Sequence, residues 1–544
     1  MKKKISVSCF VILMVLPSSL LLYPSLGLIQ SYEGSNIQIS DILSQGRGVI
    51  ITTARTEWLG VKQAGAHTID INNDAIDDLF IGGDEMRIFF GHTGVWSNHT
   101  VEEADATIIN NASTMQISNP VGVGDVNKDG FSDIIMASLW DISLGWVNTN
   151  TMSKAYLFFG GNRSDWIMGT PVTNADVTFI AEATGDYMGH GMDGVGDCNN
   201  DGYDDIVITS EFNDQAGNNA GKAYLILGRS SNEWKKTTNI TEAASASFLG
   251  TSSHNTLGVT AAGVGDVNND GFDDFLLSAN KYPGRIIYLI FGRSSDKWQK
   301  NVPIEDVANV TIMISTENEH GGMAGRYMSG LGDVNQDGLE DFAFGAYKDN
   351  EGGTQTGQAF VFFGRNTTHW PSTPTTVFAA DYANASFIGE SIDDNAGFSV
   401  SGAGDINGDG YNDILIGAAN ADVSNKGKAY VIFGRAYGWV MDQSLSQANL
   451  TFTGDYPHDL RGWNSIFAFD VSGLGDINED GYADFSISAP FADNHKGIVF
   501  VIFGNTTWFP SSTPTSTRTP AWPPIILILS LIVVFTFRKR MKQG

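Results

Sequence analysis

The chain has 544 residues and a formal net charge of −29, with 42% hydrophobic and only 17% charged residues. This apolar content is ample for a packed core and excludes a disordered polyanion. The negative charge argues against binding to nucleic acid, because the phosphate backbone repels an acidic surface.

The first predicted element is an export signal. Residues 1–30 begin with MKKK, continue with an apolar run and contain small residues around Ser25 and Gly27. This order is typical of a signal peptide, although the length of the apolar run leaves an uncleaved N-terminal anchor as the alternative. Cleavage would leave Cys198 as the only cysteine, so no internal disulfide is expected in the exported chain.

An acidic nine-residue motif follows. It occurs seven times from residue 70 onward, at intervals of 55, 72, 69, 67, 72 and 71 residues. Aspartate occupies positions 1, 5 and 9 and asparagine position 3, while position 6 is glycine in every copy except the first, which has Ala75. Oxygen ligands at this spacing suit Ca²⁺, which accepts about six to eight oxygens. A single copy is equally well read as a solvated acidic turn, but the regular repetition predicts up to seven calcium sites, the first of them the weakest.

An EF-hand is excluded, because it requires a glutamate at position 12 and a helix on each side, whereas position 12 here is apolar in all copies. The loops are therefore predicted to join two β-strands. The predicted side-chain ligands are Asp70, Asn72, Asp74, Asp78, Asp125, Asn127, Asp129, Asp133, Asp197, Asn199, Asp201, Asp205, Asp266, Asn268, Asp270, Asp274, Asp333, Asn335, Asp337, Asp341, Asp405, Asn407, Asp409, Asp413, Asp476, Asn478, Asp480 and Asp484.

Each repeat contains four strand-like segments. A glycine-rich segment leads into the loop, and strands such as DILIGA, KAYVIFG and ANLTFTG follow it. Four short strands repeated seven times predict an all-β, seven-bladed β-propeller with four-stranded antiparallel blades over residues 48–504. The seventh repeat lacks a fourth strand, and an unassigned strand, VIITT at residues 49–53, precedes the first repeat. This N-terminal strand is predicted to complete blade seven and to close the ring.

Eleven of the twelve tryptophans fall into two groups. One follows the third strand of every repeat, and we interpret this group as packing between blades instead of stacking on sugars. Its members are Trp96, Trp166, Trp234, Trp298, Trp370, Trp439 and Trp508. The non-repeating Trp58, Trp140, Trp146 and Trp463 fall in connections on the face opposite the acidic loops, where they are candidates for ligand binding.

The C-terminal region predicts a membrane anchor. Residues 505–520 form a linker rich in Ser, Thr and Pro, residues 521–537 an apolar segment at the short limit for a transmembrane helix, and residues 538–544 a basic tail. The basic tail places the C-terminus in the cytoplasm and the propeller outside the cell. Nine Asn-x-Ser/Thr sequons, beginning at Asn98 and Asn111, permit glycosylation of an exported chain.

Segments such as YVIFGRA, NDILIGAA and ADFSISAP around the DxNxDG loop resemble the FG-GAP repeat of the integrin α-subunit propeller. The resemblance covers nearly the whole predicted ectodomain and implies calcium loops on one face of the disc, between the first and second strands of each blade. It also implies that the carbonyl of position 7 is a ligand. These residues are Ile76, Phe131, Tyr203, Phe272, Leu339, Tyr411 and Tyr482.

The chain also departs from the integrin pattern. All seven blades carry the loop, no thigh-like or calf-like module follows blade seven, and no metal-dependent adhesion domain is inserted. An integrin-type heterodimer is therefore not expected.

Taken as a whole, these features predict a non-enzymatic cell-surface protein whose propeller binds an extracellular protein or glycan, as in cell adhesion. No HExxH, GxSxG or Cys–His arrangement occurs, and aspartates held ionised by a metal are poor proton donors. An exported hydrolase built on a propeller and a structural component of a cell-envelope layer are the alternatives.

Overall fold

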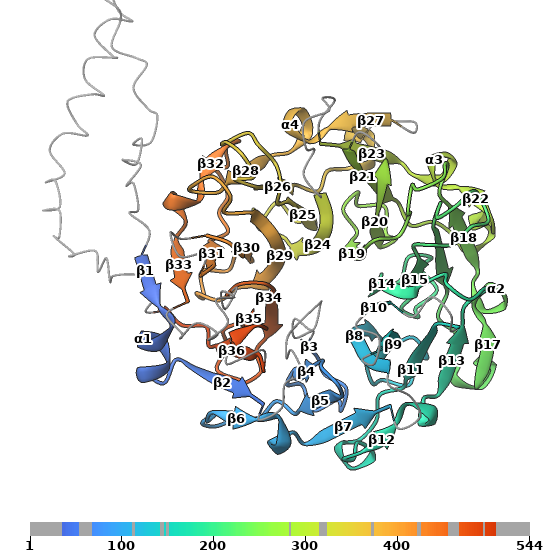
Figure 1. Ribbon diagram of the computed structural model, residues 1–544, viewed down its shortest axis with the longest axis horizontal. Helices are drawn as coiled ribbons and strands as arrows, with labels where there is room; N and C mark the ends of the chain where they lie inside the picture. The colour runs from blue at the N-terminus through green and yellow to red at the C-terminus, as the bar shows by residue number, and fades with distance from the viewer. Residues whose placement is uncertain are drawn as a thin grey trace, which may run out of the picture.

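The computed structural model describes residues 35–53, 68–110, 115–141, 146–147, 152–281, 284–314, 324–370, 375–421, 426–454, 467–492 and 496–506. Seven sheets surround a central axis in these residues, which confirms the predicted seven-bladed β-propeller (Figure 1). The predicted signal segment, the membrane segment, the basic tail and all but the first two residues of the linker lie outside the described residues. No helix within the described ranges is long and apolar enough to cross a membrane.

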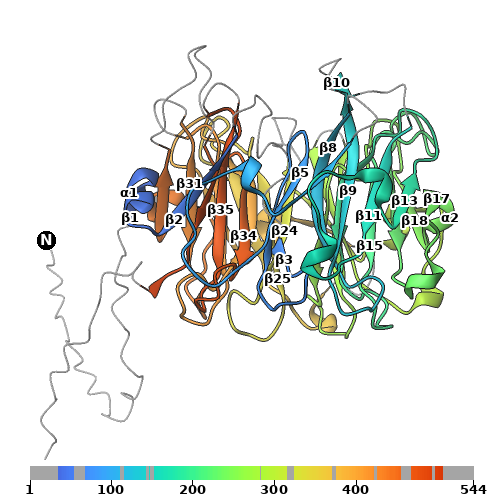
Figure 2. The same cartoon turned by 90° about the horizontal axis from the view of Figure 1, so that it is seen from below.

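The strands of each blade run between the two faces of the disc, as the edge-on view shows (Figure 2). The innermost, first strands are β3 (Thr68–Ile69), β8 (Met115–Gly124), β14 (Met188–Gly194), β19 (Ala261–Gly265), β24 (Ala324–Gly332), β29 (Ala396–Gly404) and β34 (Val471–Gly475). The second strands are β4 (Asp78–Ile81), β9 (Asp133–Asp141), β15 (Ile206–Ser210), β20 (Asp274–Lys281), β25 (Asp341–Ala346), β30 (Asp413–Ala418) and β35 (Asp484–Ala489).

The third strands are β5 (Met86–Phe89), β11 (Lys154–Phe158), β16 (Lys222–Ile226), β21 (Gly284–Ile290), β26 (Gln358–Phe362), β31 (Lys428–Ile432) and β36 (Ile498–Ile502). The fourth strands are β7 (Ala106–Ile109), β13 (Val177–Ile180), β18 (Ala246–Leu249), β23 (Val310–Met313), β28 (Ala385–Ile388), β33 (Leu450–Thr453) and β2 (Gly48–Thr52). All four strands of a blade pair antiparallel with their neighbours, for example β19, β20, β21 and β23 in blade four.

The expectation of four strands per blade is incomplete, because each sheet gains a further strand on its outer edge. This strand belongs to the connection between the third and fourth strands of the next blade and pairs parallel with the fourth strand, as β27 pairs with β23. The outer strands are β12 (Thr170–Pro171), β17 (Thr237–Asn239), β22 (Val302–Pro303), β27 (Thr375–Phe378), β32 (Gln443–Ser444), β1 (Ser35–Gln38) and β6 (His99–Thr100). They are only two to four residues long, and strands this short carry too weak a pattern to be read from the sequence.

A short helical turn follows each of the seven outer strands. Four of these turns are α-helical: α1 (Ile39–Ser44), α2 (Ile240–Ala243), α3 (Ile304–Val307) and α4 (Ala379–Tyr382). The other three are 3₁₀ turns: η1 (Val101–Glu103), η3 (Val172–Asn174) and η7 (Leu445–Gln447). A second set of 3₁₀ turns precedes the repeated tryptophan: η2 (Arg163–Asp165), η4 (Ser231–Glu233), η5 (Ser295–Lys297) and η6 (Thr367–His369).

The N-terminal segment closes the ring. All five residues of β2 pair antiparallel with β36, so the N-terminal strand completes blade seven, as the sequence predicts. Ahead of it, β1 adds the outer strand of blade six, and α1 packs Ile39 and Ile42 into the hydrophobic cluster between blades six and seven. In the other blades an outer strand and a helical turn connect the third strand to the fourth. In blade seven, β1 and α1 take these places ahead of the fourth strand β2.

The core lies between the blades, because each sheet packs on a neighbouring sheet across both of its faces. Second and third strands such as β15 and β16 are therefore buried at every residue. Six of the seven repeated tryptophans contribute to this packing, and Trp508 lies outside the described residues. Trp96, Trp298 and Trp370 are less than 10% exposed, and the Arg293 guanidinium lies 4.7 Å from the centre of the Trp298 ring.

Candidate metal centres

Each acidic loop leaves a first strand and enters a second strand, so the topology places all seven on the same face of the disc. The loop of blade four illustrates how the backbone is folded. One carboxylate oxygen of Asp266, at position 1, accepts the backbone N–H of Asp270 at 3.0 Å, and the other accepts that of Gly271 at 2.8 Å. The same two hydrogen bonds form in every loop. The position-1 aspartate therefore shapes the turn as well as being a predicted ligand.

The turn requires positive φ at two places. In blade four these are Asn269 at position 4, with φ of 57°, and Gly271 at position 6, with φ of 87°. Position 6 has the same conformation in the first loop, where Ala75 has φ of 70°. An L-residue with a Cβ is strained in this region, whereas glycine is not.

Position 9 is the most deeply buried carboxylate of the loop, with no exposed surface in any of the seven copies. In blade four, Asp274 accepts the N–H of Gly292 at 2.8 Å with one oxygen and the N–H of Val267 at 3.1 Å with the other. Gly292 belongs to the FG dipeptide that ends the third strand, and the equivalent pair of bonds forms in all the other blades. This aspartate ties the loop to the third strand.

The FG glycine is a site residue that the ligand pattern did not reveal. A Cβ on Gly292 would overlap the backbone of Asp273 and the side chain of Phe272, so only glycine brings its N–H to the position-9 carboxylate. The signal in the sequence is the FG dipeptide at the end of nearly every third strand.

The carboxylates of one loop crowd together in a buried setting. Burial, together with the position-1 and position-5 carboxylates of the same loop, raises the pKa of Asp133, Asp341 and Asp413 to about 8, although backbone N–H groups oppose the shift. Burial likewise raises the pKa of Asp78 to about 7. The backbone N–H groups offset the negative charge of these carboxylates only in part, so each loop suits a divalent cation.

The position-3 amides also suit a cation. In blade two the Asn127 Oδ1 accepts the N–H of Asp129 at 2.8 Å. In blade three the Asn199 Oδ1 has no hydrogen-bond partner although Asn199 is only 5% exposed. A buried amide oxygen without a donor is costly unless a further group satisfies it. This oxygen and the carboxylates around it make an all-oxygen donor set, which fits Ca²⁺ in chemistry.

In this structure, these carboxylates accept hydrogen bonds from the N–H groups of their own loop. Within the described residues, no three or more His, Cys, Asp or Glu side chains are grouped so that they could hold a metal ion. The predicted ligands thus lie together in seven loops. Calcium binding itself stays a prediction.

Replacing Ala75 with Gly should strengthen calcium binding at the first loop about fivefold to tenfold, because it removes the strain of a Cβ at positive φ, worth on the order of 1 kcal/mol. The reverse change, Gly271→Ala, should weaken the fourth loop by a similar factor. A Cβ on Gly271 has only the Asn200 side chain nearby, at 3.8 Å, so backbone strain is the sole effect of this control. Calorimetric titration measures both; an unchanged weakest site in Ala75→Gly would show that position 6 does not set the affinity.

Two aspartates of one loop should separate folding from metal binding. With excess chelator, Asp413→Ala should destabilise the protein by about 3 kcal/mol, because it leaves the buried N–H groups of Gly434 and Ile406 without an acceptor. Asp409→Ala in the same loop should change stability little, because Asp409 is exposed. Urea unfolding compares the two, and equal losses would argue against a structural role for position 9.

The four candidate ligand-binding tryptophans are placed only in part. Trp58 and Trp463 lie outside the described residues. Trp140 lies near the end of β9, and Trp146 begins the short strand β10 (Trp146–Val147), which pairs antiparallel with β9. Both therefore lie on a hairpin that rises from the face opposite the acidic loops (Figure 2).

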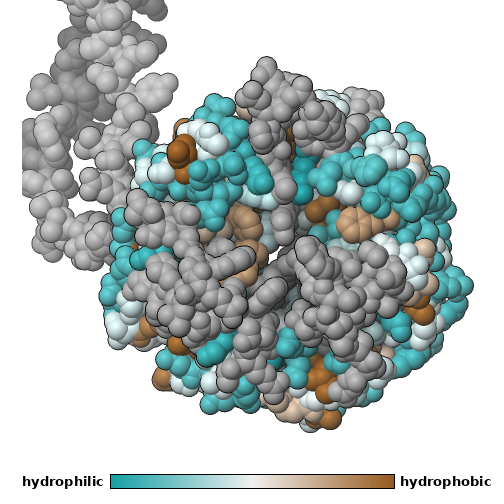
Figure 3. All heavy atoms as spheres, viewed as in Figure 1, coloured by the Kyte–Doolittle hydropathy of each residue, from teal (hydrophilic) through white to brown (hydrophobic). Residues whose placement is uncertain are grey.

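Sequence reasoning missed a row of aromatic rings on the face opposite the acidic loops, which we call the far face. The Phe398 ring lies 5.0 Å from Tyr347 and 5.0 Å from Phe469, and Phe469 lies 5.8 Å from Phe491, measured between ring centres. These residues stand where first strands begin or second strands end, in blades five, six and seven. The far face is otherwise mainly hydrophilic where it is described (Figure 3). The signal in the sequence was an aromatic residue seven positions before the loop in blades six and seven.

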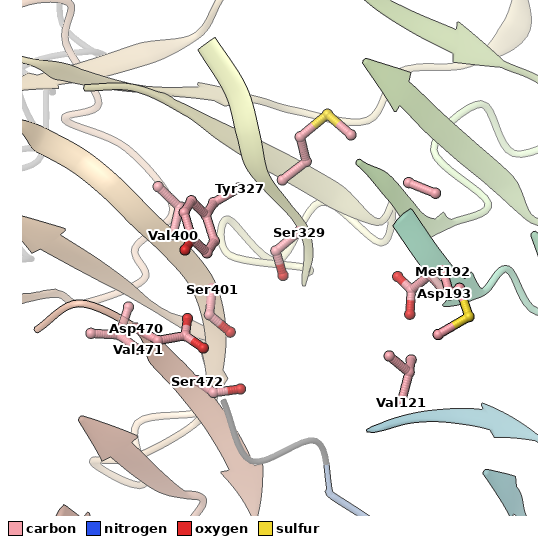
Figure 4. Close-up of a pocket in the computed structure, with 12 residues that line it drawn as sticks. Val121, Met192, Asp193, Tyr327, Ser329, Val400, Ser401, Asp470, Val471 and Ser472 are labelled. Atoms are coloured by element: carbon pink, nitrogen blue, oxygen red, sulfur yellow. The ribbon is translucent and has the colours of Figure 1, made fainter. Parts of the chain in front are cut away.

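A cavity of about 70 Å³ lies on the propeller axis, and its walls include Asp193, Ser329, Ser401 and Ser472 (Figure 4). Three of these side chains, Asp193, Ser329 and Ser401, join neighbouring blades, and the Ser329 hydroxyl accepts the N–H of Gly402 at 3.4 Å. The Asp193 carboxylate accepts the N–H of Gly263 at 3.0 Å, and the Ser401 hydroxyl accepts the N–H of Gly473 at 3.3 Å. Their hydrogen bonds indicate that these side chains hold neighbouring blades together.

Comparison with known proteins agrees with this geometry. The FG-GAP repeat family matches residues 396–432 and 468–502, and an FG-GAP-like repeat matches residues 197–277. Similar proteins include integrin alpha pat-2 of Caenorhabditis briggsae, 27% identical over 252 residues that make up 43% of this chain and 18% of that protein. Integrin alpha-5 of Xenopus laevis is 30% identical over 182 residues, 33% of this chain and 15% of that protein. The chain carries FG-GAP repeats and is a distant homologue of integrin α-subunits.

The matched segments thus span less than a fifth of these relatives. Among solved structures, the WD40 domain of Toxoplasma gondii coronin aligns over 84% of this chain and 85% of its own, with 7% identity and a TM-score of 0.42.

Proposed function

We propose that the chain is a membrane-anchored, extracellular calcium-binding propeller that binds a protein or glycan ligand and acts in adhesion, without enzymatic activity. The observation that carries the proposal is the sevenfold repetition of one loop, folded each time by the same backbone hydrogen bonds around an all-oxygen set of side chains. The distant homology to integrin α-subunits supports an extracellular location and a role in ligand binding.

Calcium in this proposal stiffens the disc. Residues at positions 1, 3, 5 and 9 of each loop, with the carbonyl of position 7, would hold the ion, whose charge offsets that of the carboxylates. The loops join first and second strands, so a bound ion fixes the inner strands of each blade relative to one another. The far face then presents its connections on a rigid frame, as is common for binding loops.

Within the described residues, the far-face aromatic row is the part of the surface that best suits a ligand. Phe398, Phe469 and Phe491 are partly exposed in a row that crosses blade boundaries, and aromatic residues are enriched where protein surfaces bind partners. The hairpin of β9 and β10 stands on the same face.

Cells that display the full chain should bind one class of immobilised protein or glycan on an array, and chelator should reduce this binding. The double variant Phe398→Ser and Phe469→Ser should abolish it. Tyr437→Ser, which removes an aromatic side chain that is 85% exposed and lies in the connection between the third and fourth strands, should not. Binding that survives the double variant but is lost with Tyr437→Ser would place the ligand elsewhere.

A further inference from the structure

Position 8 of the acidic loops reaches across to the neighbouring blade instead of into its own loop. The Asp204 carboxylate of blade three accepts the backbone N–H of Asp125, the first loop residue of blade two, at 2.8 Å. The Asp273 carboxylate of blade four accepts the N–H of Asp197 in blade three, also at 2.8 Å. Each of these acids thus fixes the residue with which the preceding loop begins.

A glycine in the preceding blade makes room for this contact. A Cβ on Gly124 would overlap the Asp204 carboxylate, and a Cβ on Gly196 would overlap that of Asp273. The same arrangement closes the ring, since a Cβ on Gly475 of blade seven would overlap the carboxylate of Asp77 from blade one. The carboxylate at position 8 therefore lies against the backbone at the start of the preceding loop.

The charges of two loops meet at this position. Asp204 lies in the field of Asp125 from the preceding loop and of Asp197 from its own. Asp77 is placed in the same way between Asp476 and Asp70. A divalent cation in either loop would reduce the repulsion that the shared carboxylate experiences, and this makes occupation of the other loop more favourable.

Three junctions of the ring lack such an acid. Position 8 is Ser132 in blade two, Asn412 in blade six and Ala483 in blade seven, whereas Asp77, Asp204, Asp273 and Glu340 occupy it in the other blades. The backbone contact between loops persists without the acid, because the N–H of Ala483 donates to the carbonyl of Asp405 at 3.1 Å, as that of Asp204 donates to Asp125 at 3.3 Å. The junctions therefore share this backbone contact and differ in the side chain at position 8. They also differ at position 4, where Lys128 of loop two lies 5.2 Å from the centre of the Tyr203 ring of loop three and loop six has Gly408.

We propose that the position-8 acids Asp77, Asp204, Asp273 and Glu340 couple calcium binding between neighbouring loops, so that the ring responds in linked segments and not as seven independent sites. The inference rests on the proposed calcium function and adds residues that touch two loops at once. Coupling is reciprocal by linkage: silencing either loop of such a pair weakens the other. Junctions with a neutral residue at position 8 stay independent.

The test follows individual loops by hydrogen–deuterium exchange of the full chain over a calcium titration. Peptides covering residues 125–133 report loop two, and those covering residues 405–413 report loop six. Asp201→Ala silences loop three and should raise the calcium midpoint of loop two about threefold to tenfold, the range expected for one screened carboxylate near a divalent ion. Asp480→Ala silences loop seven and should leave loop six unchanged within about twofold, because Ala483 carries no charge.

Asp204→Asn provides the second arm, since the amide keeps an acceptor oxygen for Asp125 and removes the charge. In this background Asp201→Ala should no longer shift loop two. Equal shifts at the two junctions, or a loop two that ignores Asp201→Ala, would overturn the coupling. If Asp204→Asn does not fold, Asp204→Ser takes its place, because serine is the residue of blade two at this position and also removes the charge. If no loop of the unaltered chain gains protection with calcium, the proposed calcium function fails, and the coupling fails with it.

Discussion

Removing calcium should lower the free energy of unfolding of the propeller by about 10 kcal/mol. An ion that binds only the folded state stabilises it by RT ln(1 + [L]/Kd), which is roughly 1.4 kcal/mol per site at tenfold saturation, and seven sites of this kind add up to that total. The effect is larger than typical single substitutions because the site recurs in every blade. Buried position-9 carboxylates that then lack a counter-ion add to the loss.

Thermal unfolding in excess chelator measures this effect. The matched control is the same chelator already saturated with calcium, which leaves ionic strength and buffer unchanged. A melting temperature that is the same in both chelator solutions would show that the seven loops do not stabilise the fold by binding calcium.

Deleting residues 35–53 should be comparably destabilising, because these residues supply β1, α1 and β2. The deletion removes the fourth strand of blade seven and the buried side chains of Ile39, Ile42, Val49 and Ile51. Each such side chain stabilises by about 1.5–3 kcal/mol, so roughly 6–12 kcal/mol is lost in addition to the strand's hydrogen bonds. The ring would open at blade seven and expose a sheet edge.

Two smaller changes locate the effect of this deletion. Ile51→Asp places a charge at a fully buried position of β2 and should mimic most of the loss. Deleting residues 35–38 alone removes only the outer strand of blade six and should cost much less. Urea unfolding of the three variants would contradict the closing role of β2 if the full deletion were no worse than the loss of β1.

The sequence predicted the parts of the fold that repeat. Seven loops at near-constant spacing, and a strand at residues 49–53 with no partner of its own, suffice for the propeller and its closure, because chance rarely repeats such a pattern. The structure bears this out in the pairing of β2 with β36. The outer strands escaped prediction because pairs such as His99–Thr100 are too short to show a period of two.

The candidate site was predictable in residue type but not in the division of roles. Spacing assigned the position-9 aspartate to the metal, yet Asp274 also binds Gly292 of the third strand, a contact that only the tertiary fold creates. The role of Asp204 escaped for the same reason, since its partner Asp125 lies 79 residues earlier in the chain. The far-face aromatic row was missed because its rings come from different blades.

The number of calcium ions bound by the folded chain shows whether the seven loops are metal sites. Native mass spectrometry over a range of free calcium should show seven ions at saturation, and Asp409→Ala should remove one of them without unfolding the chain. A folded chain that carries no calcium at the highest free calcium concentration would contradict the assignment of the repeated loops as metal sites. A stoichiometry that Asp409→Ala leaves unchanged would contradict it as well.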